Sequence, residues 1–348
     1  MLQANHGDCF LISHTNGNKV FNILIDGGNK TTFSHGPHQR YSGELRILLD
    51  ELKRKDQYID LLILTHFDDD HIGGLIRGYE TRGYLQEMVK RVWFNSSLAI
   101  TDYFEHTKIV ENEISISSSA AQTTAEQGST LEKLLMKTEC ELLPIQTAGE
   151  KLECGPFTFK ILSPTKECLK KLLCIWPKEK SDGETSGSEN DYHLTFDELQ
   201  SEDNFEEDTS LSNESSIAFI IEAEEKKMLF LGDAHNNIII KSLRELGYSE
   251  DFKLDVEFFK ISHHASKYNT SLELLNMIDA KKYLISSNGV KKGAVSKKTI
   301  SRIMKSSKDG VVFFNYKEVV DRIIFKEKNK DFYSEKLIGF SKSQEFLV

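Results

Sequence analysis

The chain has 348 residues, of which 39% are hydrophobic and 28% charged, and its formal net charge is −10. These proportions are typical of a soluble globular protein. No apolar run approaches the roughly 20 residues of a membrane span, and residues 1–8 are too polar for a signal peptide, so we expect a cytoplasmic protein with no membrane partner. We expect one main domain over residues 1–348 that carries insertions.

The net charge is unevenly distributed along the chain. Residues 178–214 contain thirteen acidic residues and two lysines, and this segment, also rich in Ser, Asn and Gly, is predicted to be a mobile surface insertion. Residues 281–308 contain nine Lys and Arg residues and no acidic residue. That stretch could receive a polyanion or form an ordinary solvated helix face, and charge alone leaves both open.

In chain order, the first predicted elements are two strands over residues 9–13 and 20–26, which form a hairpin. The second strand ends on Asp26, followed by two glycines. Asp26 either caps this turn or braces a nearby metal ligand. A helix over residues 44–52 and a strand over residues 61–64 then complete a β-α-β unit.

The strand over residues 61–64 runs into the sequence THFDDDH. Alternate side chains of an extended loop face the same way, so His66, Asp68 and Asp70 can converge there. His71 joins them if the backbone turns at that point.

Three consecutive carboxylates in this loop repel one another, and a folded site tolerates that crowding best beside a cation. A metal centre is therefore the leading interpretation, with an acidic turn and incidental histidines as the alternative. Gly73 and Gly74 are expected to give the turn room and to lie at the start of a helix over residues 72–79.

A strand over residues 91–94 precedes a predicted helical insertion over residues 97–143, in which no chemical motif occurs. His106, on this insertion, and His35 and His38, in an earlier Gly/Pro loop, are expected at the surface. The five cysteines have irregular spacing and no CxxC pair, which predicts reduced thiols rather than a cysteine-based zinc site.

In the second half, two more strands end in polar residues of the types that bind metals. One ends at Gly232 and Asp233, and the next runs into His263 and His264. The predicted elements of this half are strands over residues 157–162, 216–222, 227–231 and 256–261, and a helix over residues 167–173.

Four apolar strands thus end in candidate ligands, which is how α/β proteins build sites from the loops that follow rigid strands. The nitrogen and oxygen atoms of these side chains suit two borderline or hard divalent metals.

The motifs LIDGG, THFDDDHIGG, FLGDAH and ISHHASKYNTS resemble, in this order, those of the metallo-β-lactamase superfamily. In detail the chain is most similar to the ComEC-like branch, the carboxy-terminal domain of competence proteins. The shared features are a GDC sequence near the start, the HxDxDH variant, Asn-x-x-Ser at residues 213–216 and the histidine pair. The resemblance covers residues 7–271 and leaves the helical and acidic insertions unmatched.

The resemblance implies an α/β fold, the αββα metallo-β-lactamase sandwich, with two divalent metal ions, Zn or Mn, at one edge. His66 and Asp68 would hold one ion, Asp70, His71 and His264 the other, and Asp233 would bridge them. Asp68 stands where a histidine is more common, which favours manganese without excluding zinc. At the position of the superfamily's third motif the nearest residue is Asn213, and His193 lies in the acidic insertion, so the first ion is expected to be weakly held.

The resemblance also implies roles around the ions. Asp70 would orient the attacking water, and His263 would face the substrate as a general acid or oxyanion donor, although the sequence does not settle which histidine of the pair binds metal. Asp26 would brace the ligand loop from outside, and Asn213 would lie beside it. Three further residues near the site are expected to contact substrate or to have plain surface or capping roles: Lys267, Tyr268 and Ser271.

The expected function is a metal-dependent phosphodiesterase, a nuclease acting on DNA through a metal-activated water. One alternative is a hydrolase of a small ester, lactone, thioester or lactam. Another, of a different class, is a regulatory or defence-system partner protein whose metal site is structural.

Overall fold

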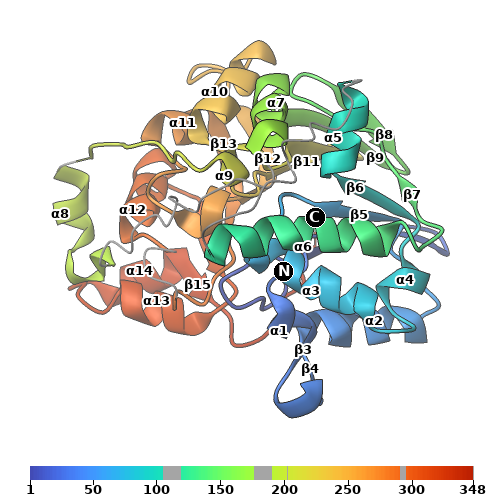
Figure 1. Cartoon of the computed structure of the whole chain (residues 1–348). Helices are drawn as coiled ribbons and strands as arrows, with labels where there is room; N and C mark the ends of the chain where they lie inside the picture. The colour runs from blue at the N-terminus through green and yellow to red at the C-terminus, as the bar shows by residue number, and fades with distance from the viewer. Residues whose placement is uncertain (105–118, 176–189, 202, 291–294, 348) are drawn as a thin grey trace.

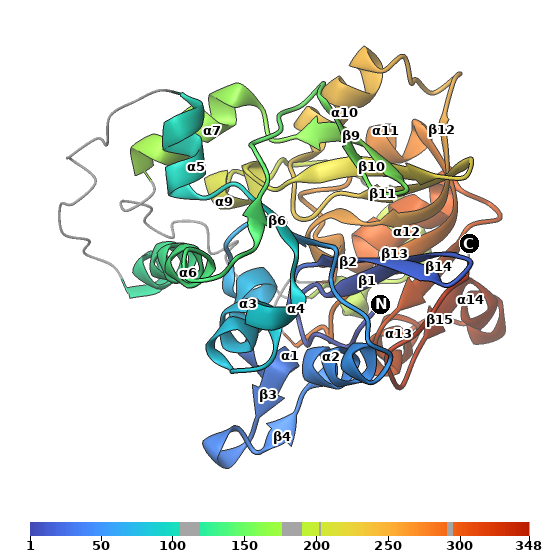
Figure 2. The same cartoon turned by 90° about the vertical axis from the view of Figure 1, so that its right-hand side faces the viewer.

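The structure, a computed structural model, describes residues 1–104, 119–175, 190–201, 203–290 and 295–347. It consists of two packed β-sheets with helices on both outer faces (Figure 1). Figure 2 shows the blue and cyan helices of the amino-terminal half grouped apart from the orange and red helices of the carboxy-terminal half. The predicted αββα sandwich of the metallo-β-lactamase fold is therefore confirmed.

The first sheet has the strand order β1-β2-β5-β6-β7. Strands β1 and β2 form an antiparallel hairpin, and the remaining neighbours are parallel. Its strands are β1 (Phe10–Asn16), β2 (Lys19–Ile25), β5 (Leu61–Leu64), β6 (Arg91–Phe94) and β7 (Glu141–Leu142). The helices of this half are α1 (Lys30–Phe33), α2 (Glu44–Arg54), α3 (Asp69–Glu80), α4 (Leu85–Met88), α5 (Ser97–Tyr103) and α6 (Ser119–Leu135).

The second sheet has the order β15-β14-β13-β12-β11-β10-β9-β8. Its strands are β8 (Lys151–Cys154), β9 (Phe157–Ser163), β10 (Ala218–Ala223), β11 (Lys226–Phe230), β12 (Leu254–Lys260), β13 (Ile278–Ile285), β14 (Val311–Phe314) and β15 (Leu337–Gly339). The helices of this half are α7 (Lys166–Ile175), α8 (Phe196–Ser201), α9 (Leu211–Glu214), α10 (Asn236–Glu245), α11 (Leu272–Asn276), α12 (Lys297–Ser306), α13 (Lys317–Ile323) and α14 (Lys330–Lys336).

Short elements complete the described chain. The hairpin of β3 (Ser34–His35) and β4 (Tyr41–Ser42), closed by the 3-10 turn η1 (Pro37–Gln39), projects from the body below α1 in Figure 1. Two more 3-10 turns are η3 (Asp191–His193) and η4 (Ser262–Ala265). No helix in the described ranges has the length and apolar character of a membrane span.

Strand β5 shows how the layers follow from the sequence. Leu62 and Leu64 pack with the helices outside the first sheet, whereas Leu61 and Ile63 pack in the core between the sheets. Successive strand residues point to opposite faces, and both faces of this sheet are covered, so all four residues are apolar.

Most predicted elements agree with the structure. Strands β5 and β6 have the predicted bounds. The predicted amino-terminal hairpin, the α2 helix and the strands β9, β10, β11 and β12 agree to within a few residues. The predicted β-α-β unit is present, because β2 and β5 pair in parallel across α2. These are the segments whose apolar pattern is least ambiguous.

The predicted role of Gly73 and Gly74 is wrong. Helix α3 begins at Asp69, so both glycines lie inside the helix and make no turn. A side chain at Gly74 would collide with the carbonyl oxygen of Gly27, and one at Gly73 would crowd the backbone of Lys30. The glycines therefore let the loop after β2, which carries Asp26, pack closely against α3, which carries Asp70 and His71.

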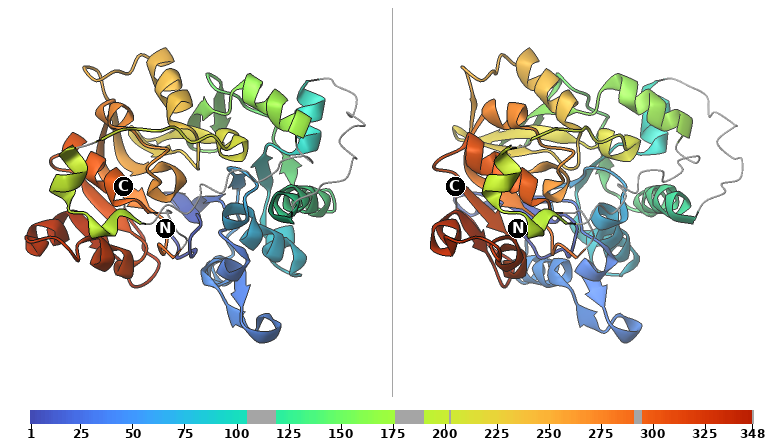
Figure 3. Two further views of the ribbon diagram at one scale, coloured as in Figure 1. Left: turned by 60° about the vertical axis from the view of Figure 1, so that its left-hand side comes forward. Right: turned by 90° about the vertical axis from the view of Figure 1, so that its left-hand side faces the viewer.

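The acidic insertion differs from the predicted surface segment in the part that the structure describes, residues 190–201 and 203–214, here called the acidic strap. Tyr192 and Phe196 are buried in the core outside the second sheet. Figure 3 shows α8 of the strap, in yellow-green, beside the orange and red carboxy-terminal helices. Two aromatic side chains in a hydrophilic segment are enough to anchor it, although the average composition hides them.

The strap also neutralises the basic stretch. Asp191 accepts hydrogen bonds from the backbone N–H groups of Lys297 and Lys298 at the start of α12, both 2.8 Å. The carboxylate of Asp203 pairs with the Arg302 guanidinium at 2.6 Å. The first turns of α12 are therefore neither a solvated face nor an open polyanion surface, because the chain's own acidic residues occupy them.

Candidate metal centre

Four imidazole rings converge on one carboxylate oxygen. The Oδ2 atom of Asp233 lies 3.7 Å from Nε2 of His66, 3.4 Å from that of His71, 3.7 Å from that of His263 and 3.8 Å from that of His264. His66 follows β5, His71 lies in the first turn of α3, Asp233 follows β11, and the histidine pair forms η4 after β12. The candidate centre thus draws its side chains from the ends of strands in both sheets.

Two further carboxylates divide the cluster into two ligand sets around Asp233. In the first set, Oδ2 of Asp68 lies 3.6 Å from Nε2 of His66. In the second set, Oδ2 of Asp70 lies 3.5 Å from Nε2 of His264, and its Oδ1 lies 4.0 Å from Nε2 of His71. The structure therefore brings together all six side chains predicted to bind metal.

Each of the four rings turns Nε2 inward because its Nδ1 contacts an oxygen outside the cluster. The outward contacts are those of His66 with Thr65 Oγ1 at 3.1 Å, His71 with Asp26 Oδ2 at 2.8 Å, His263 with Asn269 Oδ1 at 3.0 Å and His264 with the Ser286 carbonyl at 2.8 Å. Metal-binding histidines are oriented in this way, through a hydrogen bond from the other ring nitrogen.

Three of the inward nitrogens, those of His66, His71 and His264, are buried and have no hydrogen-bond partner among the described residues. A buried polar nitrogen without a partner is costly. The three atoms fit a cation, which would accept their lone pairs.

Asp26 contacts both Thr65, just before the ligand loop, and the ring of His71. Its Oδ1 accepts a hydrogen bond from the Thr65 backbone N–H, and its Oδ2 accepts one from the Thr65 hydroxyl, both 2.8 Å. Its Oδ2 also contacts Nδ1 of His71. The carboxylate therefore fixes the orientation of the His71 ring relative to the strand that carries the ligand loop.

The charge of the centre also fits two cations. In the described part of the chain, Lys260 is the one lysine buried in or against the cluster. The carboxylates there are six, those of Asp8, Asp26, Asp68, Asp70, Asp208 and Asp233. Two divalent ions nearly balance these charges, whereas a single one leaves a clear excess of negative charge. The candidate ligand groups found among the described residues consist of histidine and aspartate.

The charges also shift the pKa values of the ligands. Burial acts to lower the pKa of His264, but the carboxylates of Asp233 and Asp8 outweigh it and raise this pKa to about 9. In the same way, Asp233 and Asp26 hold the pKa of His71 well above its ordinary value despite burial. Burial would raise the pKa of Asp233, but the neighbouring imidazoles hold it well below the ordinary value. Protons on these rings occupy places that a metal ion would take.

Sequence reasoning assigned no role to Lys260 and Asp8. The ammonium of Lys260 is buried in an ion pair with Asp8, donates to the Gly232 carbonyl at 2.9 Å and lies 3.8 Å from Oδ1 of Asp233. Asp8 in turn lies 3.3 Å from Nδ1 of His264. A lysine at the end of the apolar strand β12, and the GDC sequence itself, were the signals that could have found this pair.

Asp208, in the acidic strap, was also missed. It is buried, its Oδ2 lies 3.4 Å from Nδ1 of His263, and it accepts hydrogen bonds from the side-chain amides of Asn213 at 2.7 Å and Asn269 at 2.9 Å. Its carboxylate is held ionised, because hydrogen bonds and the imidazole of His263 lower its pKa against the effect of burial. Among thirteen acidic residues of one segment, no local signal distinguishes it.

The strap also contacts the first ligand set directly. The Ser212 hydroxyl donates to Oδ1 of Asp68 at 2.7 Å. Asn213, expected beside the ligand loop, lies against His263, with its amide nitrogen 3.4 Å from Nδ1 of the ring. His193 is exposed on η3 and is not part of the cluster.

The residues expected to contact substrate have different surroundings. Lys267 and Tyr268 are half-buried on the loop after η4, with the lysine ammonium 5.0 Å from the centre of the tyrosine ring. Ser271 is buried and caps α11, its side chain accepting a hydrogen bond from the Leu274 backbone N–H. Its position thus matches the capping alternative.

The remaining isolated histidines lie away from the cluster. His35 and His38 are exposed on the projecting hairpin. His106 lies outside the described residues.

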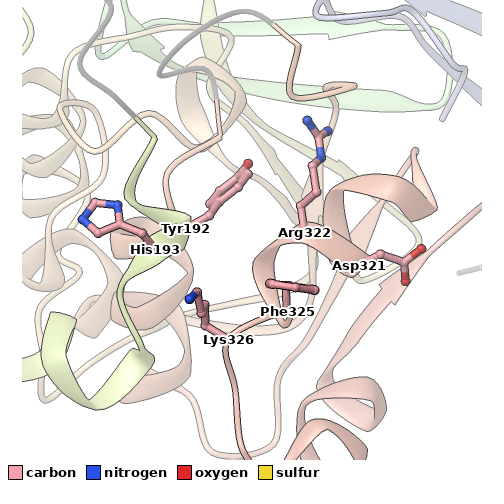
Figure 4. A pocket seen from close by; sticks show the side chains of 6 residues that line it. All are labelled: Tyr192, His193, Asp321, Arg322, Phe325 and Lys326. Carbon is pink, nitrogen blue, oxygen red and sulfur yellow. The ribbon is translucent and has the colours of Figure 1, made fainter.

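A separate hollow of about 460 Å³ lies between the strap and α13 (Figure 4). Arg322 is engaged there with the carbonyl oxygens of Asn288 and Gly289. The hollow is lined by Tyr192, His193, Asp321, Arg322, Phe325 and Lys326. None of these residues belongs to the cluster, so the hollow adds nothing to the candidate centre.

The comparison with protein families gives a match over part of the chain. The family model of the metallo-beta-lactamase superfamily matches residues 3–109. No curated protein matches the chain.

Several solved structures are similar in arrangement. CmlA, a diiron beta-hydroxylase from Streptomyces venezuelae, is 13% identical with a TM-score of 0.44, over 98% of this chain and 54% of that one, so the chain spans about half its length. A possible metal-dependent hydrolase from Veillonella parvula is 10% identical with a TM-score of 0.42, over 96% and 94% of the two chains. An isothiocyanate hydrolase from Delia radicum gut bacteria is 11% identical with a TM-score of 0.44, over 100% and 98%. Similarities of this size carry no information about the reaction.

Proposed function

We propose that this chain is a metal-dependent hydrolase that cleaves phosphodiester bonds, with DNA as its substrate class, starting from the match of the metallo-beta-lactamase superfamily model to residues 3–109. The observation that carries the hydrolase assignment is the arrangement around Asp233, whose Oδ2 has four imidazole nitrogens within 3.8 Å. The choice of DNA is supported by the HxDxDH motif and the histidine pair of the ComEC-like branch.

Two ligand sets on either side of one carboxylate suit a displacement at phosphorus. Two divalent ions held there would lower the pKa of a water molecule and stabilise charge on the substrate oxygens. The first set and Asp233 would hold one ion, and the second set and Asp233 the other. Asp70, in the second set, would orient the attacking water.

The open side of the centre indicates where a substrate would approach. The side chains of Asp68 and His263 are 31% and 17% exposed, whereas those of His66 and His71 are 0% exposed. A phosphodiester would therefore reach the centre over the first set. Lys267, on the loop after η4, is half-buried and close in sequence to His263.

The alternative of a small ester, lactone, thioester or lactam is favoured by one observation. The strap occupies the basic residues Lys297, Lys298 and Arg302 of α12, so these residues add little attraction for a long polyanion. Phosphate recognition in the leading proposal must then come from the centre and the loop after η4.

The deciding experiment assays pure protein on single- and double-stranded DNA, RNA and a generic phosphodiester, with manganese, zinc or a chelator. We expect hydrolysis that needs metal and that falls by at least about 10³-fold in His66→Ala and Asp233→Asn, since each removes a ligand around which charge is stabilised. The matched control is His193→Ala, an exposed histidine outside the cluster.

If the metal-loaded protein opens lactones or thioesters and cleaves no phosphodiester, the substrate class is wrong. If the metal-stripped protein retains full activity, the hydrolytic centre itself is wrong.

A further inference from the structure

We propose that His263 is the third protein ligand of the first metal ion, together with His66 and Asp68, and that Asp208 and Asn269 are its positioning residues. This assignment rests on the proposed metal centre and replaces the general-acid role that the resemblance implied. It fills the position for which the sequence offers only Asn213.

The inward nitrogen of His263 lies as far from the Asp233 carboxylate as the inward nitrogen of His66, an expected ligand. Its Nε2 lies 3.7 Å from Oδ2 of Asp233, the distance also found for His66. Two adjacent residues of the acidic strap link His263 to the first set, because Ser212 donates to Asp68 and Asn213 contacts the His263 ring, whereas His264 lies 3.5 Å from Asp70 of the second set. The two adjacent histidines therefore serve different ligand sets.

The outer nitrogen of His263 contacts an oxygen outside the cluster, as do the outer nitrogens of the expected ligands His66, His71 and His264. Its Nδ1 lies 3.0 Å from Oδ1 of Asn269 and 3.4 Å from Oδ2 of Asp208. His71 has the same kind of contact with Asp26, at 2.8 Å. An imidazole fixed at Nδ1 by an acceptor offers Nε2 as a lone pair to a metal.

The backbone of η4 makes it possible for both histidines to reach one oxygen. His263, His264 and Ala265 have φ values of 46°, 52° and 69°, so three consecutive residues other than glycine adopt the left-handed conformation. Neighbouring residues of an extended chain would point to opposite sides. This costly conformation persists where the surrounding structure fixes it, and such residues cluster at functional sites.

The side-chain amide nitrogen of Asn213 lies on the outer side of the His263 ring. Its amide nitrogen donates to Asp208 and lies 3.4 Å from Nδ1 of His263, the outer nitrogen of the ring. Asn213 therefore contacts the side of His263 that faces away from Asp233. Asn213 therefore holds the Asp208 carboxylate beside the His263 ring.

The test measures bound metal directly, without relying on turnover. Metal-free wild type, His263→Gly and His264→Gly are titrated with Mn²⁺ by calorimetry, and the electron paramagnetic resonance spectrum reports whether the bound ions are exchange-coupled as a pair. Glycine tolerates the left-handed backbone at both positions, so the variants are expected to fold, which circular dichroism verifies. His193→Gly is the matched control.

We expect two coupled ions in wild type and in the control. His263→Gly should keep one tightly bound ion and lose the coupled spectrum, and added imidazole should restore both. Asp208→Asn and Asn269→Leu should weaken one of the two ions by about 10- to 100-fold and leave the other unchanged.

Two coupled ions of wild-type affinity in His263→Gly would overturn the assignment, as would uptake of fewer than two ions by wild type. If wild type binds two ions and His263→Gly binds one, but no phosphodiester is cleaved, the ligand assignment stands and the proposed substrate falls.

Discussion

The two ligand sets of the centre are held in different ways. In the second set, His71 and His264 have side chains 0% and 3% exposed, and their outer nitrogens contact Asp26 and the Ser286 carbonyl, at the ends of the central strands β2 and β13. In the first set, the side chain of Asp68 is 31% exposed and receives its hydrogen bond from Ser212 of the acidic strap. One set is thus built into the sandwich, and the other depends on a segment docked on α12.

We therefore expect one ligand set to provide high affinity for metal and the other to provide access for substrate. A buried set with rigid outer contacts is expected to hold its ion tightly, whereas an open set with contacts from a docked segment leaves room for substrate. Four changes test this comparison.

The largest effect is expected for Lys260→Met. Without its ammonium, Asp8 remains as a buried charge without its principal partner, which costs on the order of 3–5 kcal/mol of unfolding free energy. Because Asp8 also contacts His264, the affinity of the second set should fall with it. Chemical denaturation measures the stability, and the double variant Asp8→Asn, Lys260→Met should recover most of it. Wild-type stability in the single variant would show that the pair has no structural role.

Asp26→Asn should weaken the ion of the second set by about 10- to 100-fold and that of the first set less, since Asp26 contacts the His71 ring directly and reaches His66 only through the Thr65 hydroxyl. Mn²⁺ titration by calorimetry separates the two affinities. Asp56→Asn is the matched control, because Asp56 is exposed and shares the positive φ of Asp26, 52° against 56°. An equal loss at both sets would contradict the division between them.

The stability of the metal-free protein should depend on pH. The folded-state pKa of His264, about 9 against an ordinary value of 6.5, means that its contribution is fully present below about pH 6.5 and is lost as pH rises through 9. Asp233, whose pKa is lowered, contributes above its ordinary pKa and loses its contribution as pH falls toward and through the lowered value.

Metal-free protein should therefore melt several degrees lower at pH 9.5 than at pH 6. The manganese-loaded protein should lose less, because metal replaces the protons on the rings. Differential scanning calorimetry with and without chelator provides the comparison. A metal-free melting temperature that rises with pH over this range would rule out protonated rings in the folded cluster.

The smallest effect is expected for Ser212→Ala. It removes one hydrogen bond to Asp68, worth about 1 kcal/mol, so the ion of the first set should bind roughly fivefold more weakly. Ser201→Ala, on the exposed end of α8, is the control within the same strap. If Ser212→Ala instead weakens the second ion, the strap supports a different set from the one proposed.

The sequence predicted the fold and the ligands where the signal is local. The four apolar residues of β5, followed at once by the ligand loop, specify an element and its chemistry within a few positions. Gly73 and Gly74 were misread because their reason is contact with the loop at Gly27, which lies far away in the chain.

What could not be predicted depends on long-range pairs. Lys260 and Asp8 are more than 200 residues apart, and neither is informative alone. In the sequence, Asp208 does not differ from the other acidic residues of its segment. Its contact with His263 follows only from the position of the strap in the fold. The left-handed turn at η4 was hidden because Ala265 stands where the superfamily pattern has glycine.

The position of the centre between the two sheets has a consequence for biosynthesis. The THFDDDH loop leaves the ribosome more than 150 residues before Asp233 and the histidine pair. Until those partners arrive, the loop is an isolated chelating peptide that favours metals by the Irving–Williams order. Both ligand sets are complete only when the second sheet packs on the first, so a protein that binds metal as proposed would select its ions at that late stage of folding.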